Sequence, residues 1–405
     1  MKVAVIGAGA AGMLAAGTAA RQGAEVYLFE KNEKPGKKIY ITGKGRCNVT
    51  NLCPPQDFLN NVVGGKKFLT SALYSFTPEM LVDLINEQGV PTKVERGNRV
   101  FPQSDKSSDI IKALERFVLS SGAKFVYERV DSVIKKGDGF TLKGEFLSYD
   151  FDKVILACGG MSYSLTGSTG DGYKFAKSFG HTVTQLRAGL SPILLKNNVK
   201  SLEGLSLRNV TATATAGGKS FTEFGEMLFT DKGVSGPIIL TLSSLINALD
   251  LSRATVSVDF KPALDNATLD KRILSDFAKY KNKMLKNALN DLMPQKLIEY
   301  FIEYVGISPD KQVNAITKPE RQAMVEALKG MKFEVDRIDD IKHAIITSGG
   351  VDLKQINPKT MESKIVPGLY FAGEMMDVDA FTGGFNLQIA FSTGYLAGKY
   401  AGGSL

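Results

Sequence analysis

Apolar and polar positions at the start of the chain follow the pattern of one βαβ unit. Residues 2–6 are apolar from Val3 onward, which is typical of a strand buried in a parallel sheet. A helix of small residues is predicted over about 12–22, Gly23 ends it, and a second strand is predicted over 25–30. This succession predicts two parallel strands joined by a crossover helix.

The α/β pattern continues to about residue 160. Amphipathic helices are predicted over 78–89 and 107–121. Short β-branched and aromatic runs, broken by glycines, predict a small antiparallel meander over 124–150. Residues 153–157 form another predicted buried strand, and a pair of glycines follows it.

The pattern changes near residue 190 and returns near residue 342. Residues 192–260 alternate Thr, Val, Leu and Phe between turn residues, which predicts strands, whereas residues 268–340 have a helical period. A predicted strand over 368–372 and a predicted helix over 386–400 then return to the α/β pattern of the first part of the chain. The middle of the chain is therefore predicted to be an insertion.

These patterns predict an α/β fold class with a discontinuous Rossmann-like domain over 1–190 and 342–405. The inserted domain, 191–341, is expected to be β-rich over 191–262 and helical over 263–341. From the topology we expect the insert to act as a substrate or cap domain.

Composition excludes several classes of protein. Hydrophobic residues make up 43% and charged residues 23%, which fits a globular chain rather than a disordered one. Three Cys without paired spacing and two His predict neither a disulfide framework nor a metal site. The chain has no apolar run of about 18 residues and no signal-peptide pattern. We therefore expect a cytoplasmic protein with no membrane partner.

The net charge of +8 raises the question of a nucleic-acid partner. The cations are spread along the chain, apart from a basic cluster over 271–286 in which only Asp276 is acidic. The cluster has few aromatic residues, so a solvated helix face is favoured over an RNA contact. We do not expect a nucleic-acid partner, and the sequence does not indicate an oligomeric state.

The segment from Gly7 to Gly12 reads GAGAAG and stands where a predicted strand passes into a predicted helix. In G-x-G-x-x-G the first glycine permits the tight turn, the second lets backbone approach a pyrophosphate, and the third lets helix pack on strand. The helix N-terminus offers free N–H groups and a partial positive charge to the phosphates. Glu30, which ends the second strand, is placed to accept hydrogen bonds from ribose hydroxyls.

Two further segments indicate which dinucleotide the chain binds. Lysines follow Glu30, and the glycines of GKGRCN (43–48) let a loop fold over a ligand. Near the other end, GLYFAGE (368–374) is a strand ending in glycine, and Gly383 and Gly384 lead into the last helix. The N-terminus of that helix suits a flavin ring, which gathers negative charge on reduction. A ligand that reaches both ends of the chain must be long, so FAD is favoured over NAD.

These residues resemble those of the BaiN-like FAD-dependent oxidoreductases, a family that includes aminoacetone oxidase-like flavoproteins. The resemblance covers essentially the whole chain. Its motifs are GAGAAG (7–12), GKGRCNVTN (43–51), RVFP (99–102), GSTGDGY (167–173), GLYFAGE (368–374) and FTGGFNLQ (381–388). One loop departs from the family: where it often reads ATGGKSYP, this chain reads ACGGMSYS (157–164).

The resemblance implies a two-dinucleotide-binding-domain flavoprotein with an inserted barrel-like and helical domain. It also implies non-covalent FAD, with Val130 and the 157–159 turn near the adenine. The predicted cofactor residues are Gly7, Gly9, Ala10, Ala11, Gly12, Glu30, Lys31, Lys37, Lys38, Gly45, Arg46, Cys47, Asn48, Val130, Ala157, Cys158, Gly159, Gly373, Glu374, Gly384, Phe385, Asn386, Leu387 and Gln388. The sequence identifies no catalytic acid or base.

The resemblance further implies hydride transfer through flavin N5 to or from a small organic substrate. Reduction of an activated C=C bond, as in a 3-oxo steroid or bile-acid-like enone, is the first expectation, with NAD(P)H as transient co-substrate. The chain has no second G-x-G-x-x-G for a separate NAD(P)H domain. An amine oxidase of the aminoacetone type that uses dioxygen, a flavin-dependent tRNA-modifying protein and a flavin-binding module without turnover remain alternatives.

Overall fold

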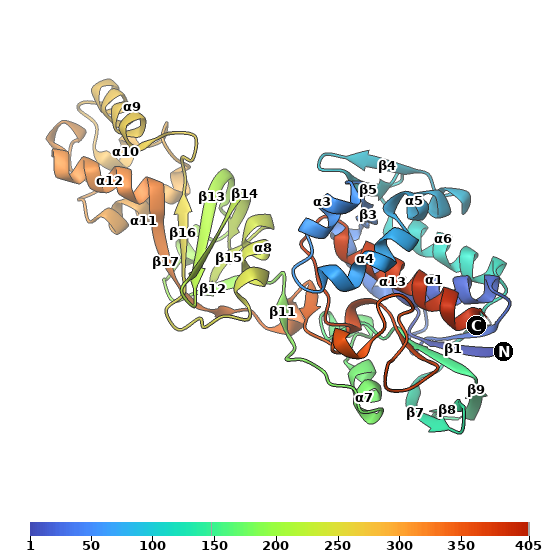
Figure 1. Ribbon diagram of the computed structural model, residues 1–405. Helices are drawn as coiled ribbons and strands as arrows, with labels where there is room; N and C mark the ends of the chain where they lie inside the picture. The colour runs from blue at the N-terminus through green and yellow to red at the C-terminus, as the bar shows by residue number, and fades with distance from the viewer. Residues whose placement is uncertain (147, 404–405) are drawn as a thin grey trace. The chain divides into compact units, whose positions relative to one another are not determined.

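The computed structural model describes residues 1–146 and 148–403. The chain divides into two compact units (Figure 1). Unit 1 comprises Met1–Gly189 and Ile341–Leu405, and unit 2 comprises Leu190–Asp340. Each unit buries a hydrophobic core of its own. Within the described ranges, no helix has both the length and the apolarity to cross a membrane.

A parallel five-stranded sheet forms the centre of unit 1. Its order is β19 (Leu369–Phe371), β10 (Lys153–Leu156), β1 (Lys2–Ile6), β2 (Glu25–Phe29) and β6 (Lys124–Val126). Strand β1 is buried from Val3 onward, as expected of a central parallel strand. The sequence pattern placed β6 in the antiparallel meander. It instead lies parallel to β2, because helix α6 (Ser107–Ser120) carries the chain across the sheet before it.

Helices and small sheets complete unit 1. Its other helices are α1 (Ala10–Arg21), α2 (Lys37–Ile41), α3 (Pro55–Asn60), α4 (Lys66–Ser75), α5 (Pro78–Glu87), α7 (Asp171–Ser178) and α13 (Phe385–Gly402). Its small sheets are β3 (Thr50–Asn51) with β5 (Arg99–Pro102) and β4 (Thr92–Glu95), the meander β7 (Val130–Lys136), β8 (Gly139–Gly144) and β9 (Ser148–Phe151), and β11 (Arg187–Gly189) with β18 (Ile346–Ser348).

Helices α1 and α13 lie side by side in unit 1 (Figure 1). Every fourth residue of α13 along this contact is a glycine. A Cβ atom at Gly394, Gly398 or Gly402 would lie 2.3, 2.4 and 2.4 Å from the carbonyl oxygens of Ala11, Ala15 and Ala19 respectively. Both series rise along the chain, so the two helices are parallel. The glycines allow this close backbone approach because a side chain would occupy the same space.

The parallel pairing places both helix N-termini on the same side of unit 1. In α13 nine residues precede Gly394, whereas in α1 one residue precedes Ala11. The first turn of α13 therefore projects eight residues beyond the start of α1 on the N-terminal side, which is about 12 Å at 1.5 Å per residue. The helix dipoles place two partial positive charges at these ends.

A closed six-stranded barrel forms the first layer of unit 2. The barrel order is β12 (Ile193–Leu195), β15 (Gly233–Ser235), β14 (Lys219–Phe229), β13 (Ser206–Ala216), β16 (Thr255–Asp259) and β17 (Met331–Ile338). The helices of unit 2 are α8 (Pro237–Ile246), α9 (Asn266–Lys279), α10 (Leu285–Ala288), α11 (Gln295–Val305) and α12 (Lys318–Gly330).

Two elements of unit 2 differ from the sequence pattern. Strand β17 lies within the part predicted to be helical, because Met331, Phe333 and Val335 alternate with polar residues and face the core. This strand pairs with both β12 and β16 and so closes the barrel. Helix α8, conversely, lies within the part predicted to be β-rich.

The basic cluster over 271–286 has more acidic partners than the sequence showed. Its ion pairs join Arg272 to Asp276 at 3.0 Å, Lys279 to Asp291 at 2.7 Å and Lys286 to Asp310 at 2.7 Å. Asp291 and Asp310 come from later segments, so the prediction that only Asp276 faces the cluster was wrong. Half of the six cations are therefore paired.

Candidate functional site

The turn between β1 and α1 is held by close backbone contacts at Gly7 and Gly12, and it has free space at Gly9. Gly7 has φ +102°, and its N–H donates to Phe29 O at 2.8 Å. A Cβ at Gly7 would lie 2.5 Å from Ala157 O, and one at Gly12 would lie 1.8 Å from Gly7 O. A Cβ at Gly9 would have no described atom within 4 Å. Gly9 therefore leaves space where a ligand can approach the backbone.

Glu30 joins the end of β2 to this turn. Its carboxylate accepts hydrogen bonds from Ala8 N at 3.0 Å, Asn32 N at 2.8 Å and Asn32 Nδ2 at 2.7 Å. The residue is 8% exposed. Lys37, which the sequence predicted as a cofactor residue, donates to Asn32 Oδ1 at 3.1 Å. Glu30 thus positions the glycine turn, and Asn32, which the sequence did not single out, supports it.

Replacing Glu30 is expected to affect both ligand and fold. Glu30→Gln should lower FAD affinity about tenfold, because the amide has one acceptor oxygen and no charge. Glu30→Ala should also lower the free energy of unfolding by about 1–3 kcal/mol, because the buried Ala8 N–H loses its acceptor. Fluorescence titration of the apoprotein with FAD and urea unfolding measure the two effects. Glu33→Ala, at a nearby exposed acid, is the control. Wild-type affinity in both Glu30 variants would remove Glu30 from the ribose site.

Lys31 is tied to the start of α7. Its Nζ atom donates to Thr169 Oγ1 at 2.6 Å and pairs with Asp171 Oδ2 at 2.7 Å. Burial raises the pKa of Asp171, but the hydrogen bonds from Lys31 and Thr169 outweigh it and bring that pKa to about 2. This pair fixes the GSTGDGY segment beside the end of β2.

Lys38 lies at the centre of a cluster that joins four segments of the chain. Its Nζ atom pairs with Glu374 Oε2 at 2.6 Å and donates to Ser162 Oγ at 2.7 Å. Glu374 Oε1 accepts from Ser162 Oγ at 3.0 Å and from Thr347 N at 2.8 Å. The sequence predicted Lys38 and Glu374 as site residues, and the structure brings them together. Ser162 and Thr347 carried no sequence signal.

The GKGRCN loop is held in an unusual backbone conformation. Gly43, Lys44 and Cys47 all have φ between 57° and 59°, in the left-handed region, and Gly45 has φ +84°. Burial raises the pKa of the Cys47 thiol to about 12, so Cys47 is not a thiolate. Asn48 Oδ1 is buried without a hydrogen-bond partner among the described residues.

The Arg46 side chain is engaged by acids on neighbouring segments. It pairs with Glu95 on β4 and with Asp105 at 2.6 Å, and these hydrogen bonds raise its pKa above the ordinary value. The guanidinium also lies 4.2 Å from the centre of the Phe101 ring. The sequence predicted Arg46 as a cofactor residue, and in the structure its charge is balanced by Glu95 and Asp105.

Two motifs far apart in the sequence are hydrogen-bonded to each other. Thr50 Oγ1 donates to Gln388 Oε1 at 2.6 Å, and Asn51 Nδ2 donates to Gly383 O at 3.0 Å. A Cβ at Gly384 would lie 2.4 Å from Thr50 O. Gln388 is fully buried and joins these segments, and its predicted contact with a cofactor stays a prediction.

Asn386 shapes the loop before α13. Its side chain accepts from Ala380 N at 2.9 Å and donates to Ala380 O at 2.7 Å. The N-cap residue Gly384 has φ +98° and, within the described part of the chain, no side chain caps the helix. The backbone N–H groups of Phe385, Asn386 and Leu387 therefore form the open first turn of α13.

The residues predicted at the adenine side lie near the glycine turn or in the meander. The 157–159 turn follows β10 and packs against Gly7. Burial raises the pKa of the Cys158 thiol to about 12. Val130 is buried at the start of β7. Of these residues, those of the 157–159 turn come close to the backbone of the glycine turn.

These features fit a long dinucleotide such as FAD. The first turns of α1 and α13 point the same way, and neither has a side-chain cap among the described residues. The open side of Gly9 would admit a diphosphate at α1, and the flavin ring would lie at α13. The unpartnered Asn48 Oδ1 offers an acceptor to a ring N–H.

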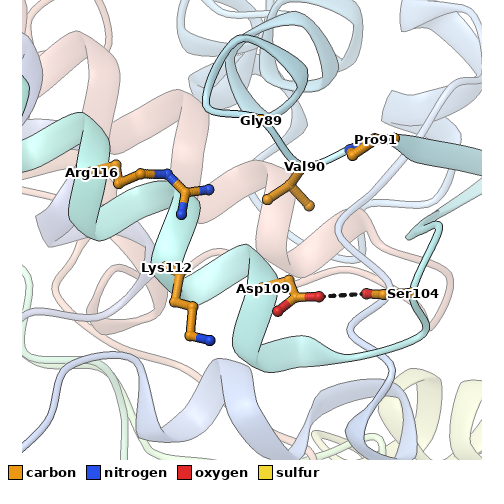
Figure 2. Close-up of a pocket in the computed structure, with 7 residues that line it drawn as sticks. All are labelled: Gly89, Val90, Pro91, Ser104, Asp109, Lys112 and Arg116. Atoms are coloured by element: carbon orange, nitrogen blue, oxygen red, sulfur yellow. Dashed lines mark hydrogen bonds between the residues drawn. The ribbon is translucent and has the colours of Figure 1, made fainter.

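A separate pocket of about 340 Å³ lies between α6 and the segment that follows α5 (Figure 2). Its lining residues are Gly89, Val90, Pro91, Ser104, Asp109, Lys112 and Arg116. Ser104 Oγ donates to Asp109 Oδ2 at 2.7 Å (Figure 2). This lining contains none of the predicted cofactor residues, so the pocket is not the predicted FAD site.

Comparison with known proteins adds an independent line of evidence. The family model for the HI0933-like protein Rossmann domain matches residues 1–400. A ribosomal RNA dihydrouridine synthase of Escherichia coli K12 is 34% identical over 395 residues, covering 96% of this chain and 95% of that protein. A 3-dehydro-bile acid delta(4,6)-reductase of Clostridium scindens is 30% identical over 406 residues, covering 99% and 98%. In fold, the chain resembles a solved 3-ketosteroid delta1-dehydrogenase of Sterolibacterium denitrificans, with a TM-score of 0.53, 14% identity and 99% coverage of both chains.

Proposed function

The chain belongs to the HI0933-like Rossmann-domain family and is an FAD-dependent oxidoreductase, and from this premise we propose that it reduces a carbon–carbon double bond conjugated to a carbonyl group. One observation carries the proposal. Two relatives that match almost the whole chain have names that describe saturation of a C=C bond in very different substrates. In uridine the C5=C6 bond is conjugated to the C4 carbonyl, and in a 3-dehydro bile acid the delta(4) bond is conjugated to the C3 carbonyl.

We assign each part of the cofactor to different residues. The backbone N–H groups at the start of α1 would bind the diphosphate over Gly9, and Glu30 would bind the ribose. The first turn of α13 would stabilise negative charge on the reduced ring. Bound FAD supplies hydride transfer through N5. NAD(P)H is the proposed donor, and it must reach the ring directly because the chain has no second G-x-G-x-x-G.

Two classes of substrate contain a C=C bond conjugated to a carbonyl group. The uracil ring of ribosomal RNA is supported by the 34% identity to the dihydrouridine synthase, compared with 30% to the bile-acid reductase. A small 3-oxo enone is supported by the half-neutralised basic cluster, which gives unit 2 less charge for RNA. The expectation that no nucleic acid is bound therefore stays a prediction, and the identities favour testing RNA first.

The donor and acceptor are tested with the purified flavoprotein under anaerobic conditions. NADPH or NADH is expected to bleach the flavin absorbance, and an enone or a uracil-containing RNA to restore it. A flavin that is bleached by an amine such as aminoacetone, and by neither nicotinamide, would favour the amine-oxidase alternative and contradict the reductase.

The two substrate classes are then separated by product analysis. Protein-free ribosomal RNA treated with the enzyme and the effective donor is digested and its nucleosides are measured by mass spectrometry. Dihydrouridine at a discrete site supports the RNA substrate, and a boiled-enzyme sample is the control. Turnover of 3-oxo-4-ene steroids without any dihydrouridine supports the small-molecule substrate. Failure of both acceptors to reoxidise the reduced flavin would overturn the proposed reaction.

A further inference from the structure

Asp379 is a buried acid in the loop between β19 and α13 that the predicted cofactor set does not include. The residue is 4% exposed, and its Oδ2 atom has no hydrogen-bond partner in the described part of the protein. Its backbone is fixed, since Asp379 O accepts from Val63 N at 2.8 Å. The Ser348 side chain hydrogen-bonds the carboxyl group. A carboxyl group in this position is rigid and keeps one oxygen free.

The surroundings of Asp379 are acidic. Asp377 and Glu374 are the charged groups that act on it, and Glu374 is balanced by its ion pair with Lys38. The packed segments 62–65 and 346–348 contain no charged residue. Burial, and then Asp377, raise the pKa of Asp379 to about 7. One proton on Asp379 neutralises its charge near neutral pH. It therefore removes both the cost of burying that charge and the repulsion by Asp377.

Asp377 is in turn influenced by a second layer of charges. Burial raises its pKa and a nearby Asp352 adds to the effect, whereas Thr184 and Arg187 oppose it. The backbone of Asp377 is held by a hydrogen bond from its N–H to Val351 O at 3.1 Å. Asp377 and Asp379 are two residues apart and both have raised pKa values, so we refer to them as an acidic pair.

The acidic pair stands next to the open first turn of α13. Ala380, which follows Asp379 directly, is bonded through both its N–H and its C=O to the side chain of Asn386 in that turn. Asp379 therefore directly precedes a residue that is hydrogen-bonded to the turn proposed to face the flavin ring. Negative charge gained by a ring at this turn would raise the proton affinity of a buried acid beside it, because charges interact more strongly in the protein interior than in water.

We propose that Asp379 is the proton-binding partner of the flavin, taking up one proton when FAD is reduced and releasing it when FAD is oxidised. The inference rests on the proposed function, because it requires the ring to lie at α13. The donor gives up two electrons as hydride and is oxidised, FAD is reduced, and a proton from water forms an O–H bond with an oxygen of Asp379. Reoxidation by the acceptor breaks that O–H bond and returns the proton to water.

The midpoint potential of the bound flavin, measured spectroelectrochemically from pH 5.5 to 9, tests the proposal. Below about pH 7 Asp379 holds its proton in both redox states and adds nothing to the slope. Above about pH 7, each rise of one pH unit should change the equilibrium constant for flavin reduction by an extra factor of ten. For a two-electron couple this lowers the midpoint potential by about 30 mV more per pH unit. In Asp379→Asn this steeper segment should be absent, because the amide does not ionise.

Asp377→Asn is the matched variant. It should retain the steeper segment and move its onset to lower pH, because Asp379 loses its acidic neighbour. A wild-type protein without the steeper segment overturns the proposal and needs no variant to fold. Retention of the segment in Asp379→Asn, or an unchanged onset in Asp377→Asn, also overturns it. A wild-type protein that binds no FAD contradicts the proposed function instead, so the two failures are distinguishable.

Discussion

Gly9→Val is expected to abolish FAD retention while leaving the fold in place. Gly9 has φ −87° and ψ −165°, an extended conformation that valine adopts without strain, and an added Cβ meets no described atom within 4 Å. The valine side chain would occupy the space proposed for the diphosphate. FAD affinity should fall at least about 100-fold, or about 2.8 kcal/mol. The apoprotein should lose about 1 kcal/mol at the helix N-cap, where valine is disfavoured.

The ratio of flavin to protein absorbance after purification, followed by titration of the apoprotein with FAD, measures the effect. Gly9→Ala is the graded control and should weaken FAD less, because one methyl group fills less of the space. Melting of the two apoproteins should differ from wild type by no more than about 4 °C. A Gly9→Val protein as yellow as wild type would show that the ligand lies elsewhere.

Gly398→Val is expected to have the largest effect on stability. Its Cβ would lie 2.4 Å from the carbonyl oxygen of Ala15, and that oxygen belongs to helix backbone and cannot rotate away. The two helices would have to separate, at a cost of about 3 kcal/mol. The midpoint of thermal unfolding should fall by about 6–12 °C, and FAD should be lost as the N-terminus of α13 moves.

Urea unfolding followed by circular dichroism measures the change, with flavin content recorded in parallel. Lys399→Ala is the matched control, since Lys399 is the next residue of the same helix and is exposed. The control should stay within about 0.5 kcal/mol of wild type. A valine variant equally close to wild type would contradict the close parallel packing of α1 on α13.

Local patterns were sufficient for the parts of the fold that depend on neighbouring residues. The strand of β1, the glycine turn and α1 follow from the spacing of apolar and glycine positions, and the structure places them as expected. The prediction of a two-domain FAD flavoprotein fold is confirmed by the family match and the likeness of fold. The individual cofactor contacts stay predictions, because a residue pattern does not fix where a ligand lies.

Long-range pairing is what the sequence could not reveal. Thr50 and Gln388 are bonded across 338 residues, and only the fold brings them together. The ion pairs of Arg46 could not be foreseen, because Glu95 and Asp105 lie on other segments. Strand β17 was missed because its period of two follows directly on the helical period of α12. Asp379 gave no signal, since burial depends on packing rather than on its neighbours in the chain.

The pairing of α1 with α13 has a consequence for biosynthesis. Some 375 residues separate the starts of these helices. A ribosome adding roughly 5–20 residues per second delivers the second helix about 20–75 s after the first. During that interval the alanine face of α1 lacks its glycine partner, whereas the whole of unit 2 has already been synthesised. Coenzyme loading must therefore wait until α13 has been synthesised, and nascent chains that stall before α13 should be colourless.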